Sequence, residues 1–328
     1  MSAEFESFQS LVRSARKFVL TTHINPDGDG LGSECALACY LRELGKQVWI
    51  LNHSETPSNY AFLGQYFPIM KFDETQHKDL VLNADALVVL DTNHLDRLAS
   101  MKSAVEQSRA RKVCIDHHLD PARFADLYIL DESSTATGEV LYHLLTFLDT
   151  SSVSTSVASS LYAAIMTDTG SFRYPKTDSE THRIIAHLID RGADPVEIYE
   201  RVYEQGSFNR MRLLGEALAG MKIVHGGTVA YLVITRTMLK ETGTTEVDTD
   251  SFVPYTMSIQ NVQIGMMFTE LAEGVKVNFR SKGDIRINEL AKEFGGNGHK
   301  NAAGARVAEK SLAEVLAAVV DRSASYTI

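Results

Sequence analysis

The sequence has few cysteines, no excess of basic side chains and no long apolar run. Three cysteines in 328 residues cannot build a disulfide framework, and their odd number is typical of a reducing compartment. The formal net charge of -10 argues against broad, salt-driven binding to long nucleic acid duplexes. No apolar run approaches the roughly 20 residues of a membrane span, and residues 1–13 lack a signal-like apolar core. We therefore expect a cytoplasmic protein that does not enter a membrane.

The length and composition indicate a globular protein of two domains. At roughly 150 residues per domain, the chain is too long for a single core. A hydrophobic content of 44% and a charged content of 23% are ordinary for a folded protein. The pattern of the chain changes from Lys222 onward, which places the boundary near residues 206–220. We predict a first domain over residues 1–205, a helical connector over 206–220 and a second domain over 221–328.

The first domain shows alternating strand and helix patterns. Short apolar runs alternate with segments whose apolar residues recur at helical spacing. This order is typical of a parallel sheet covered by helices. The predicted strands are 18–22, 47–51, 86–90 and 113–115, and the predicted helices are 31–44, 137–148, 154–166, 179–191 and 195–204.

The second domain shows hairpin patterns instead. Lys222–His225 and Thr228–Ile234 flank a Gly-Gly turn, and Val262–Leu271 and Val275–Arg280 flank a Glu-Gly turn. Hairpins require antiparallel strands. The second domain is therefore predicted to be of the α+β class.

Side chains that bind metals recur at the ends of four apolar runs. They are His23, Asp27 and Asp29 after the first strand, Asp91 after the third, Asp116-His117-His118 after the fourth, and Asp168 after Leu161–Met166. In an open parallel sheet, ligands gather at the carboxyl ends of the strands. Each residue alone is more often structural, but four such ends together favour a shared site.

The mixture of imidazoles and carboxylates favours two ions such as Mn²⁺, with Mg²⁺, Co²⁺ or Zn²⁺ as alternatives. A calcium loop starting at Asp27 fails, because Leu31 and Ala38 occupy positions that require oxygen ligands. Asp91 is placed to bridge two ions about 4 Å apart, and a hydroxide shared by two such ions attacks phosphorus in two-metal hydrolases.

These motifs resemble those of the DHH phosphoesterases. The matching residues are His-Ile-Asn-Pro-Asp-Gly-Asp at 23–29, Leu-Asp-Thr at 90–92, Asp-His-His at 116–118 and Thr-Asp-Thr-Gly-Ser-Phe-Arg-Tyr at 167–174. Gly-Gly-Asn-Gly-His-Lys-Asn-Ala-Ala-Gly at 295–304 is similar to the glycine-histidine motif of DHHA1 domains. The resemblance covers nearly the whole chain and is nearest to the stand-alone NrnA-type group. That group comprises bacterial oligoribonucleases that also dephosphorylate 3'-phosphoadenosine 5'-phosphate (PAP).

The resemblance implies a Rossmann-like DHH domain, a smaller α+β DHHA1 domain and an active site in the cleft between them. It implies that one Mn²⁺ is held by His23, Asp27 and Asp91, and the other by Asp29, Asp91, His117 and Asp168. His118 would face the scissile phosphate, with a pKa suited to proton transfer. Asp116 would orient a ligand imidazole.

In the second domain, the resemblance implies that substrate is bound by Arg280, Gly295, Gly296, Gly298 and His299. The glycines would let backbone N–H groups approach a phosphate. Asn297 departs from the family, which has a further glycine there. If that position needs a positive φ, Asn is the best-tolerated replacement.

The expected activity is hydrolysis of short RNA to nucleoside 5'-monophosphates together with phosphatase activity on PAP. A phosphodiesterase for cyclic di-AMP or its linear product is the main alternative, since its catalytic residues would be the same. A RecJ-like exonuclease and a non-catalytic nucleotide sensor are weaker alternatives. Homodimerisation is expected only because symmetric pairs are common.

Overall fold

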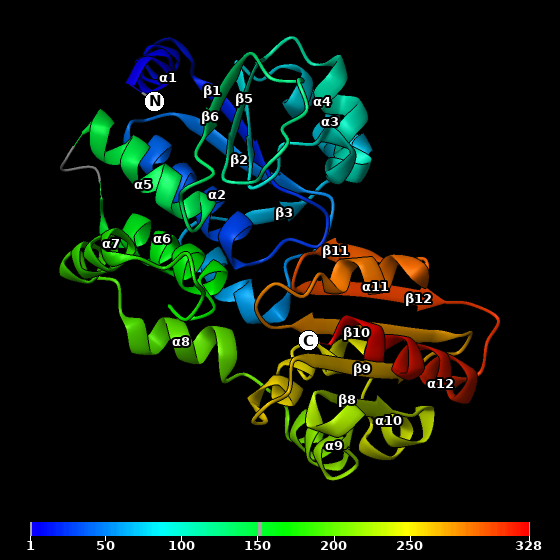
Figure 1. The fold of residues 1–328 in the computed structure, drawn as a ribbon. Helices are drawn as coiled ribbons and strands as arrows, with labels where there is room; N and C mark the ends of the chain where they lie inside the picture. Colours follow the sequence, from blue (N-terminus) through cyan, green and yellow to red (C-terminus); the bar gives the residue numbers. More distant parts are fainter. Residues whose placement is uncertain (1, 150–152, 328) are drawn as a thin grey trace. The chain divides into compact units, whose positions relative to one another are not determined.

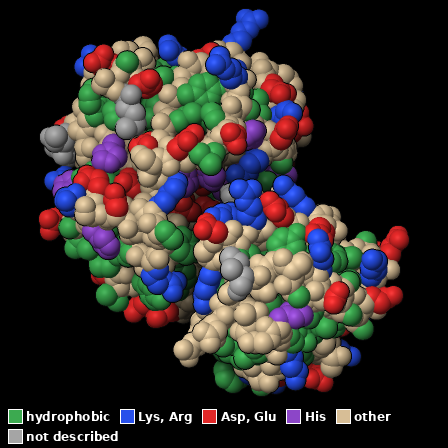
Figure 2. All heavy atoms as spheres, in the orientation of Figure 1, with side chains coloured by type: hydrophobic (Ala, Val, Ile, Leu, Met, Phe, Trp, Pro, Cys, Tyr) green, Lys and Arg blue, Asp and Glu red, His purple; other side chains and the backbone are tan. Residues whose placement is uncertain are grey.

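The computed structural model describes residues 2–149 and 153–327, except for the side chain of His299. The chain forms two compact units, Met1–Gln205 and Gly206–Ile328 (Figure 1). Acidic and basic side chains are interspersed over the drawn surface of both units (Figure 2). None of the helices in the described ranges combines the length and apolar character needed to cross a membrane.

The first unit contains a six-stranded sheet in which every neighbouring pair is parallel. The spatial order is β3-β2-β1-β4-β5-β6, so the chain reverses its direction of growth between β1 and β4. Such a switch point opens a crevice at the carboxyl ends of the two strands. The strands are β1 Lys17–Thr21, β2 Gln47–Asn52, β3 Ile69–Lys71, β4 Ala86–Leu90, β5 Arg111–Asp116 and β6 Leu127–Leu130.

Both faces of this sheet are covered because its strands are apolar on both sides. One core contains Leu20 and Ile115 of the strands together with residues from α1, α2, α5, α6, α7 and α8. The opposite core contains Val19 and Val89, packed against α3 and α4. The helices are α1 Ser2–Ser14, α2 Gly28–Glu43, α3 Glu74–Leu82, α4 Lys102–Gln107, α5 Thr137–Leu148, α6 Thr155–Asp168, α7 Ser179–Asp190 and α8 Pro195–Tyr203.

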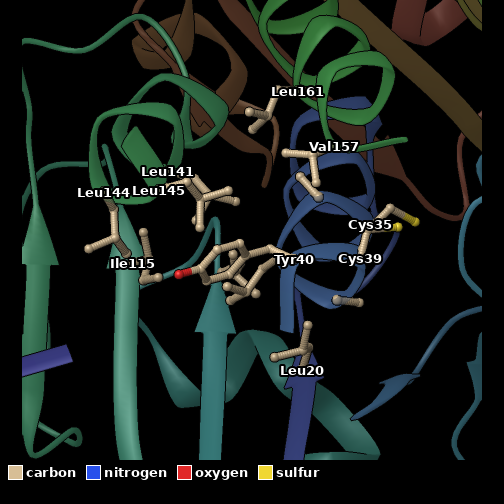
Figure 3. Close-up of a cluster of buried hydrophobic side chains, with 14 of the residues drawn as sticks. Leu20, Cys35, Cys39, Tyr40, Ile115, Leu141, Leu144, Leu145, Val157 and Leu161 are labelled. Carbon is tan, nitrogen blue, oxygen red and sulfur yellow. The ribbon is translucent and has the colours of Figure 1, made fainter. Parts of the chain in front are cut away.

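The first core also contains two of the cysteines. Cys35 and Cys39 project from the side of α2 that faces away from Leu141 and Leu144 of α5 (Figure 3), and their thiols lie 3.8 Å and 3.6 Å from the carbonyl oxygens of Leu63 and Tyr66. All three cysteines are free and buried. Cys35 and Cys39 are therefore apolar packing residues of this core.

Close packing of α2, α5 and α6 depends on two glycines. A Cβ at Gly32 would lie 2.5 Å from the carbonyl oxygen of Ser160, and a Cβ at Gly138 would lie 2.7 Å from the Cβ of Ala164. Real Cβ atoms do not approach so closely, so any larger residue would push the helices apart. These helices carry Asp29, Thr137 and Asp168, and their spacing therefore fixes part of the site.

The second unit contains a mixed sheet in the order β11-β12-β10-β9-β8-β7. Both predicted hairpins are present, since β7 pairs antiparallel with β8 and β9 with β10. The pair β8–β9 is parallel, because the long connection between these strands crosses back over the sheet. The strands are β7 Lys222–Val224, β8 Val229–Ile234, β9 Ile264–Glu270, β10 Val275–Ser281, β11 Asn297–His299 and β12 Ala302–Val307.

Helices cover both faces of the second sheet. On one face, α11 (Ile287–Glu293) and α12 (Leu312–Ser323) pack on Phe268 and Phe279. On the other, α9 (Phe208–Ala219) packs on Leu232 and Ile234, near α10 (Arg236–Thr242). The predicted α/β class, a parallel sheet followed by an α+β unit, is confirmed.

Candidate metal centre

The six predicted ligands meet at the carboxyl ends of β1, β4 and β5. His23 follows β1, Asp91 follows β4 and His117 follows β5. The remaining three come from helix ends: Asp27 and Asp29 at the start of α2, and Asp168 at the end of α6. Three groups of candidate ligand atoms form here, each with its atoms within 4.8 Å of one another. They are His23, Asp27 and Asp91; Asp29, His117 and Asp168; and Asp91, Asp116, His117 and His118.

His23 directs one ring nitrogen at two carboxylates. Its Nε2 lies 3.3 Å from Oδ2 of Asp91 and 3.8 Å from Oδ1 of Asp27. Its Nδ1 lies 2.9 Å from the carbonyl oxygen of Ile24, which can only accept a hydrogen bond. Nδ1 therefore keeps a proton, and Nε2 is the ring nitrogen that faces the carboxylates.

His117 repeats this arrangement on the other side of Asp91. Its Nε2 lies 3.4 Å from Oδ2 of Asp168, 3.8 Å from Oδ2 of Asp29 and 3.8 Å from Oδ1 of Asp91. Its Nδ1 lies 3.3 Å from the carbonyl oxygen of Ser134. A backbone carbonyl that fixes the tautomer in this way is usual for metal-binding histidines.

Asp91 is the residue common to both sides. Its Oδ2 faces His23, and its Oδ1 faces His117 and accepts a 3.0 Å hydrogen bond from the hydroxyl of Thr137. Its φ of +59° lies in the left-handed region, which is uncommon for a residue other than glycine. The backbone N–H of Asp91 bonds to the carbonyl oxygen of Ile115 at 3.0 Å, which anchors this turn to β5.

Asp29 is held by the start of a distant helix. Its carboxylate accepts hydrogen bonds from the backbone N–H groups of Thr137 at 2.6 Å and Gly138 at 2.9 Å. These N–H groups open α5, whose own preceding residue, Ala136, offers no capping side chain. Asp29 thus replaces a local cap and ties α2 to α5.

The centre carries more negative charge than its surroundings neutralise. Burial, reinforced by the carboxylates of Asp91 and Asp168, raises the pKa of Asp29 well above its usual range. Burial and the charges of Asp91 and Asp27 raise the pKa of Asp168 to about 7. For His23, burial alone would lower the pKa, but Asp27 and Asp91 outweigh it and raise the pKa to about 10. Each of these pKa shifts favours the protonated form of its group, and so reduces the net negative charge of the cluster.

His118 and Asp116 form a separate pair beside this cluster. The fully buried Asp116 accepts a 2.7 Å hydrogen bond from Nδ1 of His118 and a 2.8 Å bond from the backbone N–H of His117. Asp116 therefore orients His118, whereas the ring of His117 is oriented by Ser134. Burial lowers the pKa of His118, but Asp116 and Asp91 outweigh burial, and the net shift is upward.

Sequence reasoning missed the residues that support the centre. Glu34 of α2 is fully buried and accepts a 2.8 Å hydrogen bond from Nδ2 of Asn52. Oδ1 of Asn52 in turn accepts a 3.1 Å bond from the backbone N–H of Thr22, next to His23. Burial raises the pKa of Glu34 to about 8. A Glu in an otherwise apolar helix was the only available signal, and the partners of Glu34 and Thr137 are too distant in sequence to be inferred.

The predicted substrate-binding residues lie in the second unit. Arg280 of β10 pairs with Ala302 of β12, which pairs with His299 of β11, so the three share one row of the sheet. The side chain of His299 lies outside the described residues. The guanidinium of Arg280 donates a 2.9 Å hydrogen bond to the carbonyl oxygen of Phe279.

The glycines around β11 serve the turn and the close approach of strands. The N–H groups of Gly295 and Gly296 bond to carbonyl oxygens of α11, at Lys292 and Ala291, so they end that helix rather than point at a ligand. A Cβ at Gly296 or Gly298 would lie within 2.5 Å of a carbonyl oxygen of β12.

Asn297 needs no glycine-like backbone. It is absent from the residues with positive φ, and its Oδ1 accepts a 2.9 Å hydrogen bond from the N–H of Gly298. A side chain at position 297 is therefore compatible with the loop without backbone strain.

Acidic and imidazole side chains at the switch point of a doubly wound sheet are typical of metal-dependent hydrolases. Comparison with known proteins identifies the family. Residues 17–165 match the model of the DHH family N-terminal domain, and residues 226–324 match that of the DHHA1 domain. The chain belongs to the DHH family of phosphoesterases.

Three relatives are similar over most of the chain. The protein named bifunctional oligoribonuclease and PAP phosphatase NrnA from Thermus thermophilus is 30% identical over 87% of this chain and 82% of its own length. Its Bacillus subtilis namesake is 28% identical over 88% of each chain. The crystal structure of an exopolyphosphatase-related protein from Bacteroides fragilis matches with a TM-score of 0.94 at 30% identity, over 99% of this chain and 97% of that one.

Proposed function

We propose that this phosphoesterase uses two divalent ions, Mn²⁺ above all, to hydrolyse short oligoribonucleotides to nucleoside 5'-monophosphates and to remove phosphate from PAP. The names of the Thermus and Bacillus relatives describe these two activities. The carboxylate and imidazole cluster of this chain supplies matching chemistry.

The donor set fits such ions. Both His23 and His117 place Nδ1 against a backbone carbonyl oxygen and Nε2 against carboxylates, as metal-ligating histidines do. Four carboxylates, two of them fully buried, gather without a Lys or Arg within ion-pair distance among the described residues. Mixed nitrogen and oxygen ligands suit borderline ions such as Mn²⁺.

The geometry supports the following assignment. His23, Asp27 and Asp91 would hold one ion, and Asp29, Asp91, His117 and Asp168 the other. When bound, such ions make a water more acidic and neutralise charge on phosphoryl oxygens. Asp91 offers one oxygen to each side, and Asp29, fixed by the N–H groups of α5, keeps its orientation during the reaction.

His118 would act on the leaving oxygen. Its Nδ1–H is engaged by Asp116, so Nε2 is the atom that exchanges a proton with the substrate. Burial and two hydrogen bonds hold Asp116, which is thus a positioning residue for His118. In the second unit, Arg280 and His299 would bind substrate. The N–H groups of Gly295, Gly296 and Gly298 are bonded within the unit, so these glycines would shape the loop before His299 instead of binding a phosphate.

The single observation that carries this proposal is Asp91, whose two oxygens face imidazoles from two different strand ends. The test is product formation from labelled di- to pentaribonucleotides, PAP and cyclic di-AMP, with Mn²⁺, Mg²⁺, Co²⁺ or EDTA. With Mn²⁺, we expect mononucleotides from the oligoribonucleotides and AMP from PAP. With EDTA, we expect no product. Turnover of cyclic di-AMP alone, or no turnover of any substrate by metal-loaded protein, would refute the proposed activity.

The cytoplasmic location and the homodimer stay predictions. Light scattering of the purified chain measures its oligomeric state directly.

A further inference from the structure

The segment after β4 lies between two loops of the metal centre. This segment, residues 92–101, includes the short helix η2 (Leu95–Met101). The carbonyl oxygen of Arg97 accepts a 2.7 Å hydrogen bond from the N–H of Ile24, the neighbour of His23. On the other side, Nδ2 of Asn93 donates to the carbonyl oxygens of His118 at 3.0 Å and Leu119 at 3.3 Å. The segment is therefore fixed beside both His23 and His118, through Arg97 on one side and Asn93 on the other.

The side chain of Arg97 is half-buried and has no acidic partner there. Across the described ranges, no carboxylate lies within ion-pair distance of its guanidinium, and no hydrogen bond from it is found. The adjacent carboxylate of Asp96 is engaged elsewhere, by Lys102 at 2.6 Å. A partly desolvated guanidinium without a carboxylate keeps its planar set of donors available for an anion.

The charge of Arg97 acts on His118. It opposes the upward pKa shift of His118, but more weakly than burial, Asp116 or Asp91 act on it. Arg97 is thus close to the residue proposed for proton transfer.

We propose that Arg97 binds a second phosphoryl group of the substrate, one nucleoside away from the bond that is cleaved. This inference rests on the proposed function. The phosphate under attack is already served by the ion sites and His118, so a further cation near His118 is suited to the next phosphate. Both proposed substrate types carry one there: a 5'-phosphorylated dinucleotide has its 5'-phosphate, and PAP has a 5'-phosphate beside the 3'-phosphate that is removed. Arg97 makes the enzyme select nucleotides with two phosphoryl groups.

The test compares substrates that differ only in that group: pApA with ApA, and PAP with adenosine 3'-phosphate. Losing one charge-assisted contact costs roughly tenfold to a hundredfold in kcat/KM. We expect Arg97→Gln to lose that much on pApA and PAP, and less than about threefold on the two substrates without a 5'-phosphate, since those never make the contact. Arg97→Lys, which keeps the charge but not the fork of donors, should recover part of the loss. Arg13→Gln, on the exposed end of α1, is the matched control.

Equal losses on both members of a pair, or no loss on either, would overturn the role of Arg97. Calorimetric binding of a non-hydrolysable pApA analogue, with and without its 5'-phosphate, decides the same question without turnover. The affinity difference between the two analogues should disappear in Arg97→Gln. A parent protein that binds them but cleaves neither pApA nor PAP would refute the proposed function, while the binding difference still decides Arg97.

Discussion

The two units differ in the number of ionisable side chains that they bury. In the first unit, six acidic or imidazole side chains are buried: His23, Asp29, Glu34, Asp91, Asp116 and Glu139. In the second, the buried polar side chains among the described residues are four threonines and one serine. Its charged side chains pair near the surface, as Glu293 does with Arg322 at 2.6 Å.

This difference indicates that the first unit is less stable than it could be because it buries the charged side chains of the site. Burying like-charged carboxylates is costly unless a cation compensates them. Perturbed acids gathered in one crevice are typical of a catalytic site. The second unit has no such cluster among its described side chains.

Removing Asp91 should have the largest effect, because it would disconnect both halves of the centre. We expect Asp91→Ala to lower kcat by about 1,000-fold or more, comparable with losing a principal electrostatic group of an active site. Metal analysis should show fewer ions bound per chain. Asp79→Ala, on the exposed face of α3, is the control and should behave like the parent. Full activity of Asp91→Ala would remove the bridging role.

Replacing His118 should separate proton transfer from metal binding. Asn at position 118 can keep the contact to Asp116 but has no equivalent of Nε2. We expect His118→Asn to lower kcat by about 100-fold, with unchanged metal content. The limb of the pH–rate profile that reports the acid should disappear. A variant that loses its metal instead would make His118 a ligand.

Metal removal should distinguish the two units by stability. Mn²⁺ at 100 times its dissociation constant should stabilise the folded chain by about 2.7 kcal/mol for each site that it fills. Hydrogen exchange should show the gain at the carboxyl ends of β1, β4 and β5 and no change in β10 and β12. Equal protection of both sheets would contradict a centre confined to the first unit.

Arg280→Gln should test whether the second unit binds substrate. Because Arg280 is assigned to substrate capture and not to the reaction, we expect KM to rise about tenfold while kcat changes less than about threefold. Lys276→Gln, on the same strand but paired with Glu246 at 3.0 Å, is a control for general damage to β10. A fall confined to kcat would reassign Arg280 to the chemical step.

The smallest expected effect concerns acid stability of the second unit. Hydrogen bonds from Arg322 and Tyr326 lower the pKa of Glu293 from 4.5 to about 2. A lowered pKa stabilises the fold above pH 4.5, and this contribution is lost as the pH falls toward 2. Glu293→Gln should therefore lower the urea midpoint at pH 7 and match the parent near pH 2. Glu273→Gln, on the β9–β10 turn, should differ little from the parent at any pH.

Local patterns predicted most of the elements. The strand at residues 86–90 and the helix at 137–148 have the predicted bounds, because each is a short apolar or amphipathic run between clear end signals. The short edge strands β3 and β6 and the helix α1 were missed, although α1 has Phe5, Phe8 and Leu11 at helical spacing. The parallel pairing of β8 with β9 follows from a crossover whose direction no local pattern specifies.

The site was predicted residue by residue, but its supports were not. His23, Asp91 and His117 follow strands that are readable in sequence, and the ends of parallel strands meet by geometry. The contacts of Asp29 with Thr137 and of Glu34 with Asn52 depend on how helices pack, which single-sequence patterns do not encode. Arg97 was overlooked because nothing distinguishes it from a solvated surface arginine until its neighbours are known.

The hydrogen bonds between Asp29 and the start of α5 bear on the order of events during synthesis. A nascent chain that has not yet extended beyond Gly138 lacks the two N–H groups that tie the Asp29 carboxylate to α5, and Asp168 emerges from the ribosome later still. The proposed ion sites are therefore complete only after most of the first unit has been translated. A stalled, shorter chain would expose unpaired acids without the means to retain a cofactor.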